Sequence, residues 1–202
     1  MGYGVYLREI ELPINDPDFR MVQDNDKWRA NMIILGKRYD LSSVDTIKYL
    51  IKCGANDNST VLGWSAEKGH LDIVKYMVER DVYIHAKISA LHYSAKNGHL
   101  SIVKYLVESG TNIHGDDDAA LCASAEFGHL SVVKYLVEKK ANVHAKKDYA
   151  LRWSAHNGYL DIVKFLVESG ANIHAYNDTA LGWAAENISE LKNILEFLKS
   201  QY

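Results

Sequence analysis

Apolar residues recur at steps of three and four in a nine-residue segment that returns along the chain. In residues 100–108 (LSIVKYLVE) the apolar side chains fall on one face of a helix, while Lys104 and Glu108 fall on the opposite face. Related segments begin at residues 71, 130 and 160, so successive starts lie 29, 30 and 30 residues apart. Gly110 follows the segment, where helices often end in a left-handed residue. The pattern predicts a series of similar amphipathic helices.

A shorter segment rich in alanine and serine precedes each of these helices. Residues 90–99 (ALHYSAKNGH) show it, ending in Asn97-Gly98, which suits a left-handed stop. We expect Ser89 to cap this helix, and Asp118 and Asp148 to cap the equivalent helices one residue early. The small side chains allow neighbouring helices to approach closely. Each unit is therefore predicted to be a pair, a short inner helix followed by a longer outer one.

A fixed interval of 20 to 50 residues is typical of stacked-repeat proteins. A helix of about eight residues is marginal alone, and one such pair cannot bury both of its faces. Neighbouring pairs must stack, so stability becomes a sum of unit terms and nearest-neighbour terms. Residues about thirty apart are then expected to lie side by side.

The repeated unit resembles the ankyrin repeat. Residues 89–92 (SALH) fall on the TPLH of that family, and residues 98–107 (GHLSIVKYLV) fall on its GHLxVVKLLL block. The interval is about three residues shorter than the roughly 33 of the family, and the loss falls in the finger before the next inner helix. We therefore expect a tight turn there in place of a β-hairpin finger. The resemblance implies an all-α repeat solenoid that binds proteins and has no catalytic activity.

The resemblance covers residues 41–202. Residues 41–54 match the outer helix alone, so the array is expected to open with half a unit and to continue as five helix pairs. In the last pair Lys199 stands where Val167 stands in the pair before it, which indicates a C-terminal cap with a wetter outer face.

Residues 1–40 do not fit the repeat. Residues 5–12 read as a strand, and residues 19–22 with 27–30 read as a hairpin. Together with residues 32–38 they resemble the end of the leader domain that precedes ankyrin arrays in proteins of giant DNA viruses of amoebae. We therefore expect residues 1–40 to be a short β-rich leader, part of a truncated domain.

Charge and composition narrow the partners. The net charge of −3 argues against nucleic acid, because duplex binding needs a concentrated basic surface. No apolar run is long enough to cross a bilayer, and residues 1–20 lack a signal-peptide core. The two cysteines fit a reducing compartment. We expect an intracellular protein, in the host-cell cytoplasm by the viral resemblance, with the virion as the open alternative.

The nine histidines do not form a metal site in this pattern. Most of them fall in two repeated slots, His70, His99 and His129 in one and His85, His114, His144 and His174 in the other. Equivalent positions on stacked helices lie ~8–10 Å apart, whereas zinc ligands lie ~2 Å from one ion. We expect these histidines to bond turn backbone. No nucleophile has a recognisable base beside it, so we expect no catalytic residue, cofactor, metal or small-molecule substrate.

An aromatic slot and the position four residues later define a candidate binding stripe on the concave face of the inner helices. Trp and Tyr are favoured anchors in binding sites. The alternative is that these rings pack between repeats as core. At a second slot the residue type differs between repeats (Gly63, His92, Cys122, Arg152, Gly182). A binding face would show such differences, and so would an exposed position under no selection. The predicted stripe consists of Trp64, Lys68, Tyr93, Asn97, Phe127, Trp153, Asn157 and Trp183.

The leading hypothesis is a non-catalytic module that binds an unidentified partner protein, such as a host factor, through this stripe and the finger turns. The alternative is an architectural array that positions the leader domain or assembles into particles.

Overall fold

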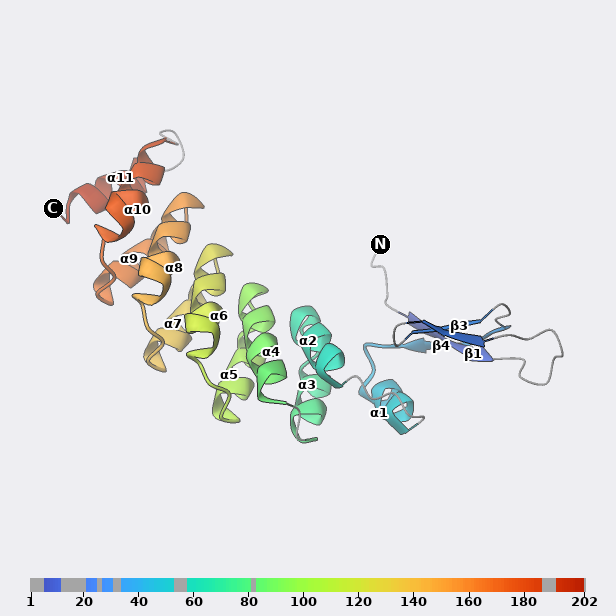
Figure 1. The fold of residues 1–202 in the computed structure, drawn as a ribbon. Coiled ribbons are helices and arrows are strands. Elements are labelled where there is room, and N and C mark those ends of the chain that lie inside the picture. Colours follow the sequence, from blue (N-terminus) through green and yellow to red (C-terminus); the bar gives the residue numbers. More distant parts are fainter. Residues whose placement is uncertain are drawn as a thin grey trace. The chain divides into compact units, whose positions relative to one another are not determined.

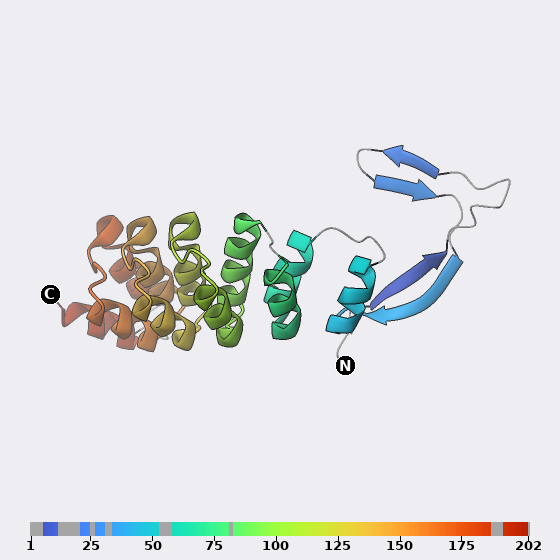
Figure 2. The same cartoon turned by 90° about the horizontal axis from the view of Figure 1, so that it is seen from below.

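The computed structural model describes residues 6–11, 21–24, 27–30, 34–52, 58–80, 83–186 and 192–201 (Figures 1 and 2). The chain divides into two compact units, Met1–Asn56 and Asp57–Tyr202.

The first unit contains two antiparallel strand pairs and a helix. Strand β1 pairs with β4 with a shift of register between Arg8 and Ile10, and β2 pairs with β3. Helix α1 buries Ile47 and belongs to this unit, although residues 41–54 were expected to open the array. The domain boundary at residue 40 stays a prediction. The elements are β1 (Tyr6–Glu11), β2 (Met21–Asp24), β3 (Lys27–Ala30), β4 (Ile34–Asp40) and α1 (Val44–Lys52).

The second unit is a stack of helix pairs. Each inner helix contacts the next inner helix, and each outer helix contacts the next outer one. The inner helices line the concave side of this stack (Figure 1). The inner helices are α2 (Asn58–Lys68), α4 (Ile84–Lys96), α6 (Gly115–Glu126), α8 (Ala145–His156) and α10 (Ala175–Glu186). The outer helices are α3 (Leu71–Val78), α5 (Leu100–Glu108), α7 (Leu130–Glu138), α9 (Leu160–Glu168) and α11 (Lys192–Lys199).

Equivalent positions of successive pairs form a continuous interior, as the interval predicts. One leucine in each of α2, α4, α6 and α8 is at most 1% exposed, and burying a leucine side chain contributes ~1.5–3 kcal/mol. Beside it lies a fully buried serine whose hydroxyl donates to the carbonyl three residues earlier, so the buried polar group is satisfied. The leucines are Leu62, Leu91, Leu121 and Leu151, and the serines are Ser65, Ser94, Ser124 and Ser154.

The turn between inner and outer helix is tied to the next repeat by histidine. The His99 Nε2–H donates to the Glu67 carbonyl at 2.9 Å, and His129 makes the same bond to the Lys96 carbonyl at 2.9 Å. For these two side chains the prediction of structural histidines bonding turn backbone is confirmed. The ring of His129 lies over Gly98, so a Cβ there would sit 2.5 Å from its Nδ1.

The later fingers contain a left-handed turn, which we define as residues 116–118, 146–148 and 176–178. All nine residues have φ between 50° and 60°. Non-glycine residues cost roughly 1–2 kcal/mol each in this region, and less for Asp and Asn. The turn brings the carboxylate of Asp118, 3% exposed, to the His114 Nδ1–H at 3.1 Å and to the backbone N–H of Asn142 at 2.9 Å. The turns at residues 116–118 and 146–148 therefore each link their finger to the next one.

The predicted helix caps are wrong. Ser89 lies inside α4, which is regular from Ile84 onward, because the interval is one residue shorter in this repeat and leaves no room for the left-handed turn. Asp118 and Asp148 do not cap their own helices. Each accepts a backbone N–H of the following repeat, a role that depends on a neighbour 24 residues away.

A ladder of lysines and aromatic rings runs along the outer helices. Each ammonium lies 5.6–5.9 Å from the centre of a ring in the next repeat, within cation–π range. The lysines lie on the polar face, as the helical pattern predicts, but their partners come from the neighbouring helix. The pairs are Lys75–Tyr105, Lys104–Tyr135, Lys134–Phe165 and Lys164–Phe197.

Candidate partner-binding surface on the inner helices

The aromatic members of the predicted stripe lie at the surface of the inner helices. The side chains of Tyr93 and Phe127 are 40% and 43% exposed, and Trp64 and Trp153 are half-buried. Ala123, which replaces the aromatic residue in α6, is buried at 4%. The rings of Trp64, Tyr93, Phe127 and Trp153 are therefore partly accessible to solvent. Trp183 lies in α10, and its side chain is outside the described residues.

The polar members of the stripe are exposed and are held by bonds near the ends of the inner helices. Lys68 pairs with Glu67 at 2.9 Å. The side-chain amide of Asn97 donates to the Tyr93 carbonyl at 2.9 Å. The amide of Asn157 donates to the Glu126 carbonyl of the preceding repeat at 2.8 Å. These contacts hold the polar side chains of the stripe in place before any partner binds.

Trp153 is held by ring contacts within α8, and its neighbour Tyr149 is held by a hydrogen bond to the preceding repeat. Trp153 lies between Tyr149 and His156, with ring centres 5.6 Å and 5.2 Å away. The Tyr149 hydroxyl donates to Glu126 Oε2 at 2.8 Å, and burial together with this bond raises the pKa of Tyr149 to about 12. Rings that are ordered before binding lose little conformational entropy on contact.

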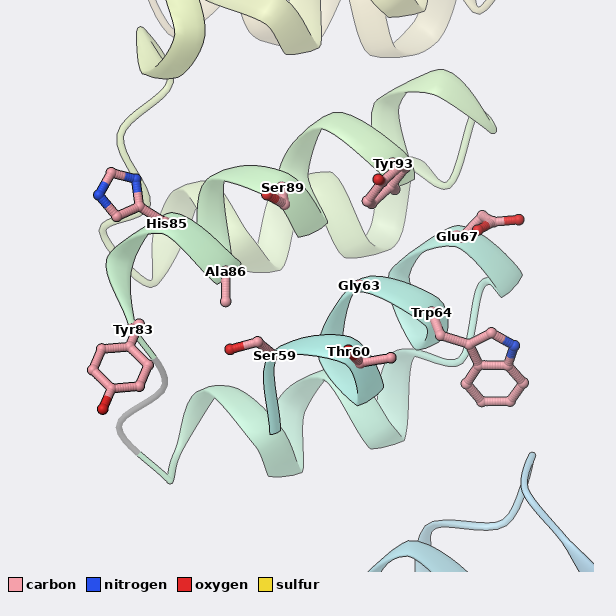
Figure 3. A pocket seen from close by; sticks show the side chains of 10 residues that line it. All are labelled: Ser59, Thr60, Gly63, Trp64, Glu67, Tyr83, His85, Ala86, Ser89 and Tyr93. Atoms are coloured by element: carbon pink, nitrogen blue, oxygen red, sulfur yellow. The ribbon is translucent and has the colours of Figure 1, made fainter. Parts of the chain in front are cut away.

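A groove of about 530 Å³ runs between α2 and α4 and includes two predicted residues, Trp64 and Tyr93 (Figure 3). Tyr83, which is 82% exposed, borders its other end with His85. Tyr83 was not among the predicted site residues. Its signal was the large ring at a position where later fingers carry asparagine.

The second variable slot is not a binding face at two of its members, because the structure buries Cys122 and Arg152 to 4% and 8% exposure. Burial raises the pKa of the Cys122 thiol to about 11. Arg152 donates from Nε and Nη2 to the carbonyls of Lys147 and Lys146 at 2.9 Å and 3.0 Å. Its guanidinium also lies 4.9 Å from the Tyr176 ring centre. The contacts of Arg152 with its finger turn indicate that the residue type at this slot depends on the finger of each repeat.

The histidines of the finger turns pair with aspartate side chains. His114, His144 and His174 each donate through Nδ1 to the aspartate four residues later, at 2.7–3.1 Å. The imidazoles are about half exposed. Within the described residues, no group of three or more His, Cys, Asp or Glu side chains is placed to hold one metal ion. The pairs hold the left-handed turns in place.

In the described part of the chain, no helix combines the length and apolar character that crossing a membrane requires.

Comparison with known proteins identifies relatives of this chain and its family. Over 82 residues the chain is 44% identical to protein R229 of Acanthamoeba polyphaga mimivirus, and over 85 residues it is 42% identical to R868 of that virus. Both are named as ankyrin repeat proteins. Protein R869, named only as uncharacterized, is 48% identical over 79 residues.

These alignments cover 36–41% of this chain and 27%, 42% and 56% of the respective relatives, so the chain spans about a quarter to a half of their length. The profile described as ankyrin repeats (3 copies) matches residues 81–147 and 125–202, which is more than half of the chain. The chain belongs to the ankyrin repeat family.

Proposed function

We propose that this chain is a non-catalytic module that binds a partner protein through the concave face of its inner helices and its finger turns. Ankyrin repeats are in general protein–protein interaction modules. The observation that carries the proposal for this face is the partial exposure of Trp64, Tyr93, Phe127 and Trp153 along one side of the stack. Half-exposed aromatic rings in fixed positions are the kind of anchor that dominates binding energy at protein interfaces.

By likeness to the viral relatives, we propose that the partner is a host protein met inside the infected cell. The leader of residues 1–40, as a β-rich domain joined to an array of residues 41–202, belongs to the same proposal. The competing function is an architectural array that positions this leader or assembles into particles. In that case the stripe serves only the packing of repeats, and its surface is free to change.

The test is quantitative capture from host-cell lysate with the full chain as bait, comparing wild type with Phe127→Ala/Trp153→Ala. A second variant, Asn157→Arg, adds bulk to the surface while removing little packing. The matched control, Ser131→Ala/Glu138→Ala, alters two exposed residues on outer helix α7. Thermal unfolding by circular dichroism is recorded for every variant.

The proposal expects one or more proteins that both stripe variants lose and the control retains, with cooperative unfolding preserved. A large fall in melting temperature for Phe127→Ala/Trp153→Ala, with unchanged capture by Asn157→Arg, would show that the stripe is interior packing. Equal capture by all variants would favour the architectural alternative.

A further inference from the structure

The groove between α2 and α4 lies at a junction where the repeats depart from the rest of the array. Later fingers contain the left-handed turn, and asparagine precedes its Ile-His or Val-His pair; the Asn112 Oδ1 accepts the His114 backbone N–H at 3.0 Å. In the repeat of α4 this asparagine is replaced by Tyr83, and α4 continues as a regular helix from Ile84. Tyr83 and Ile84 are 82% and 62% exposed. Large apolar side chains kept at the surface in one place indicate an interaction site.

The lining of the groove has a definite chemistry. Tyr93, Glu67 and Trp64 lie toward one end, and Tyr83 lies at the other end (Figure 3). The Trp64 indole points away from α4, and its ring centre lies 5.1 Å from that of His70. Hydroxyl groups of Ser59 and Ser89 lie between them. Among the ten lining residues, Glu67 carries the one carboxylate, and none is lysine or arginine. The walls therefore offer aromatic rings and a single negative charge, and the chain as a whole carries a net charge of −3.

We propose that this groove binds an arginine side chain presented by an extended segment of the partner protein, an inference that rests on the proposed function. A cation close to aromatic rings and a carboxylate is stabilised by both. Arginine suits this lining better than lysine because its planar guanidinium stacks on rings and donates two parallel hydrogen bonds to a carboxylate. The apolar stem of the side chain packs along the groove wall. A groove volume of about 530 Å³ falls within the range of ~300–1,000 Å³ typical of ligand pockets.

Lys68 competes with the proposed arginine for the same carboxylate. Its ammonium lies 2.9 Å from Glu67 Oε1, and the two side chains are 47% and 42% exposed. Pairs at such exposure hold weakly, so an arginine that also gains ring contacts displaces the lysine. This competition determines in which direction two substitutions change the affinity for arginine. Removing the Lys68 ammonium strengthens arginine binding, and neutralising Glu67 weakens it.

The test is an NMR titration of the ¹⁵N-labelled full chain with the probe acetyl-Gly-Arg-Gly-amide. The neutral control probe carries citrulline, which has nearly the shape of arginine without its charge. The indole N–H signal of Trp64 is assigned from Trp64→Phe, and that of Trp153 serves as an internal reference. We expect the Trp64 signal to move with a Kd on the order of 1–10 mM, because one side chain lacks the rest of the interface.

The citrulline probe is expected to bind at least about fivefold more weakly, since it lacks the charge that ring and carboxylate recognise. Glu67→Gln is expected to weaken the arginine probe by about fivefold, and Lys68→Ala to tighten it by about twofold or more, as one exposed ion pair allows. Equal shifts with both probes, equal movement of the Trp153 signal, or no effect of either substitution would overturn the inference.

Failure here is distinguishable from failure of the proposed function. If the probe does not discriminate but partner capture still depends on Phe127 and Trp153, the array binds proteins and the groove does not select arginine. If capture shows no dependence on the stripe while the probe binds as expected, the groove recognises arginine and the wider binding face is wrong. A captured partner that is lost from Glu67→Gln and from both stripe variants supports both.

Discussion

The link between successive fingers makes a quantitative prediction for Asp148. Its carboxylate is 4% exposed and accepts the Asn172 backbone N–H at 2.7 Å and the His144 Nδ1–H at 3.0 Å. In Asp148→Ala the Asn172 N–H loses its acceptor, which costs ~1–3 kcal/mol. Alanine also tolerates the left-handed backbone less well than aspartate, a further ~1 kcal/mol. The His144 imidazole is 56% exposed, so its pair adds less than ~1 kcal/mol.

These terms predict that Asp148→Ala lowers the free energy of unfolding by about 3 kcal/mol. The matched control is Asp178→Ala. Asp178 has the same left-handed backbone and pairs with His174 at 2.7 Å, but its side chain is 49% exposed. Water can replace the bonds lost there, so we expect a loss of about 1 kcal/mol. The difference of roughly 2 kcal/mol isolates the buried bond between repeats.

The assay is urea unfolding followed by circular dichroism at 222 nm. Asp148→Asn keeps an oxygen acceptor and tolerates the left-handed backbone, so its loss is expected to be about 1 kcal/mol. The transition of Asp148→Ala is also expected to broaden, because the coupling between neighbouring repeats is weaker. The argument would be refuted if Asp148→Ala and Asp178→Ala lower the free energy of unfolding by amounts that agree within ~0.5 kcal/mol. A difference that small is no larger than the deviation from additivity seen between independent sites.

The remaining predictions concern Thr111, two turn glycines and Cys122. Thr111→Val is expected to raise the free energy of unfolding by about 1 kcal/mol in the same urea assay, because the Thr111 hydroxyl is buried without a partner. Gly98→Ala is expected to cost about 3 kcal/mol and Gly110→Ala about 1 kcal/mol; both have positive φ, but a Cβ meets the next repeat only at Gly98, and equal costs would contradict this. With the other cysteine changed to alanine, iodoacetamide at pH 8 is expected to alkylate Cys122 about 100-fold more slowly in the folded protein than in guanidinium, because burial raises its pKa from 9.0 to about 11. The raised pKa also predicts a stability that is unchanged below pH 9 and falls by roughly 2–3 kcal/mol between pH 9 and 11, as the unfolded thiol ionises first, whereas Cys122→Ala should lose less over that range.

Much of the array could be predicted from the sequence, because the buried positions repeat. The serine and leucine slots of the inner helices were expected to lie side by side, and they form one interior. The histidine of the Gly-His turn was expected to bond turn backbone, and His99 and His129 do so. The aromatic slot predicted rings on the inner helices, and the four described ones are partly exposed. That a partner binds there stays a prediction.

Other features depend on contacts that no local pattern contains. Ser89 looks like a helix cap in sequence, but one missing residue in the preceding turn places it inside α4. Arg152 and Cys122 stand at a slot that varies like a surface, yet the finger of each repeat folds over them. Tyr83 gains its place at the groove because the left-handed turn is absent from that repeat.

By itself, the sequence determined the repeating unit, its helical faces and the residues of its interior. It did so because burial against an identical neighbour imposes the same side chains every thirty residues or so. Only the tertiary structure decided the left-handed turns, the carboxylates that join finger to finger, the lysine–ring ladder and the position of the groove. Each of these depends on the distance between groups 24 to 33 residues apart, which is set by how far one pair lies from the next.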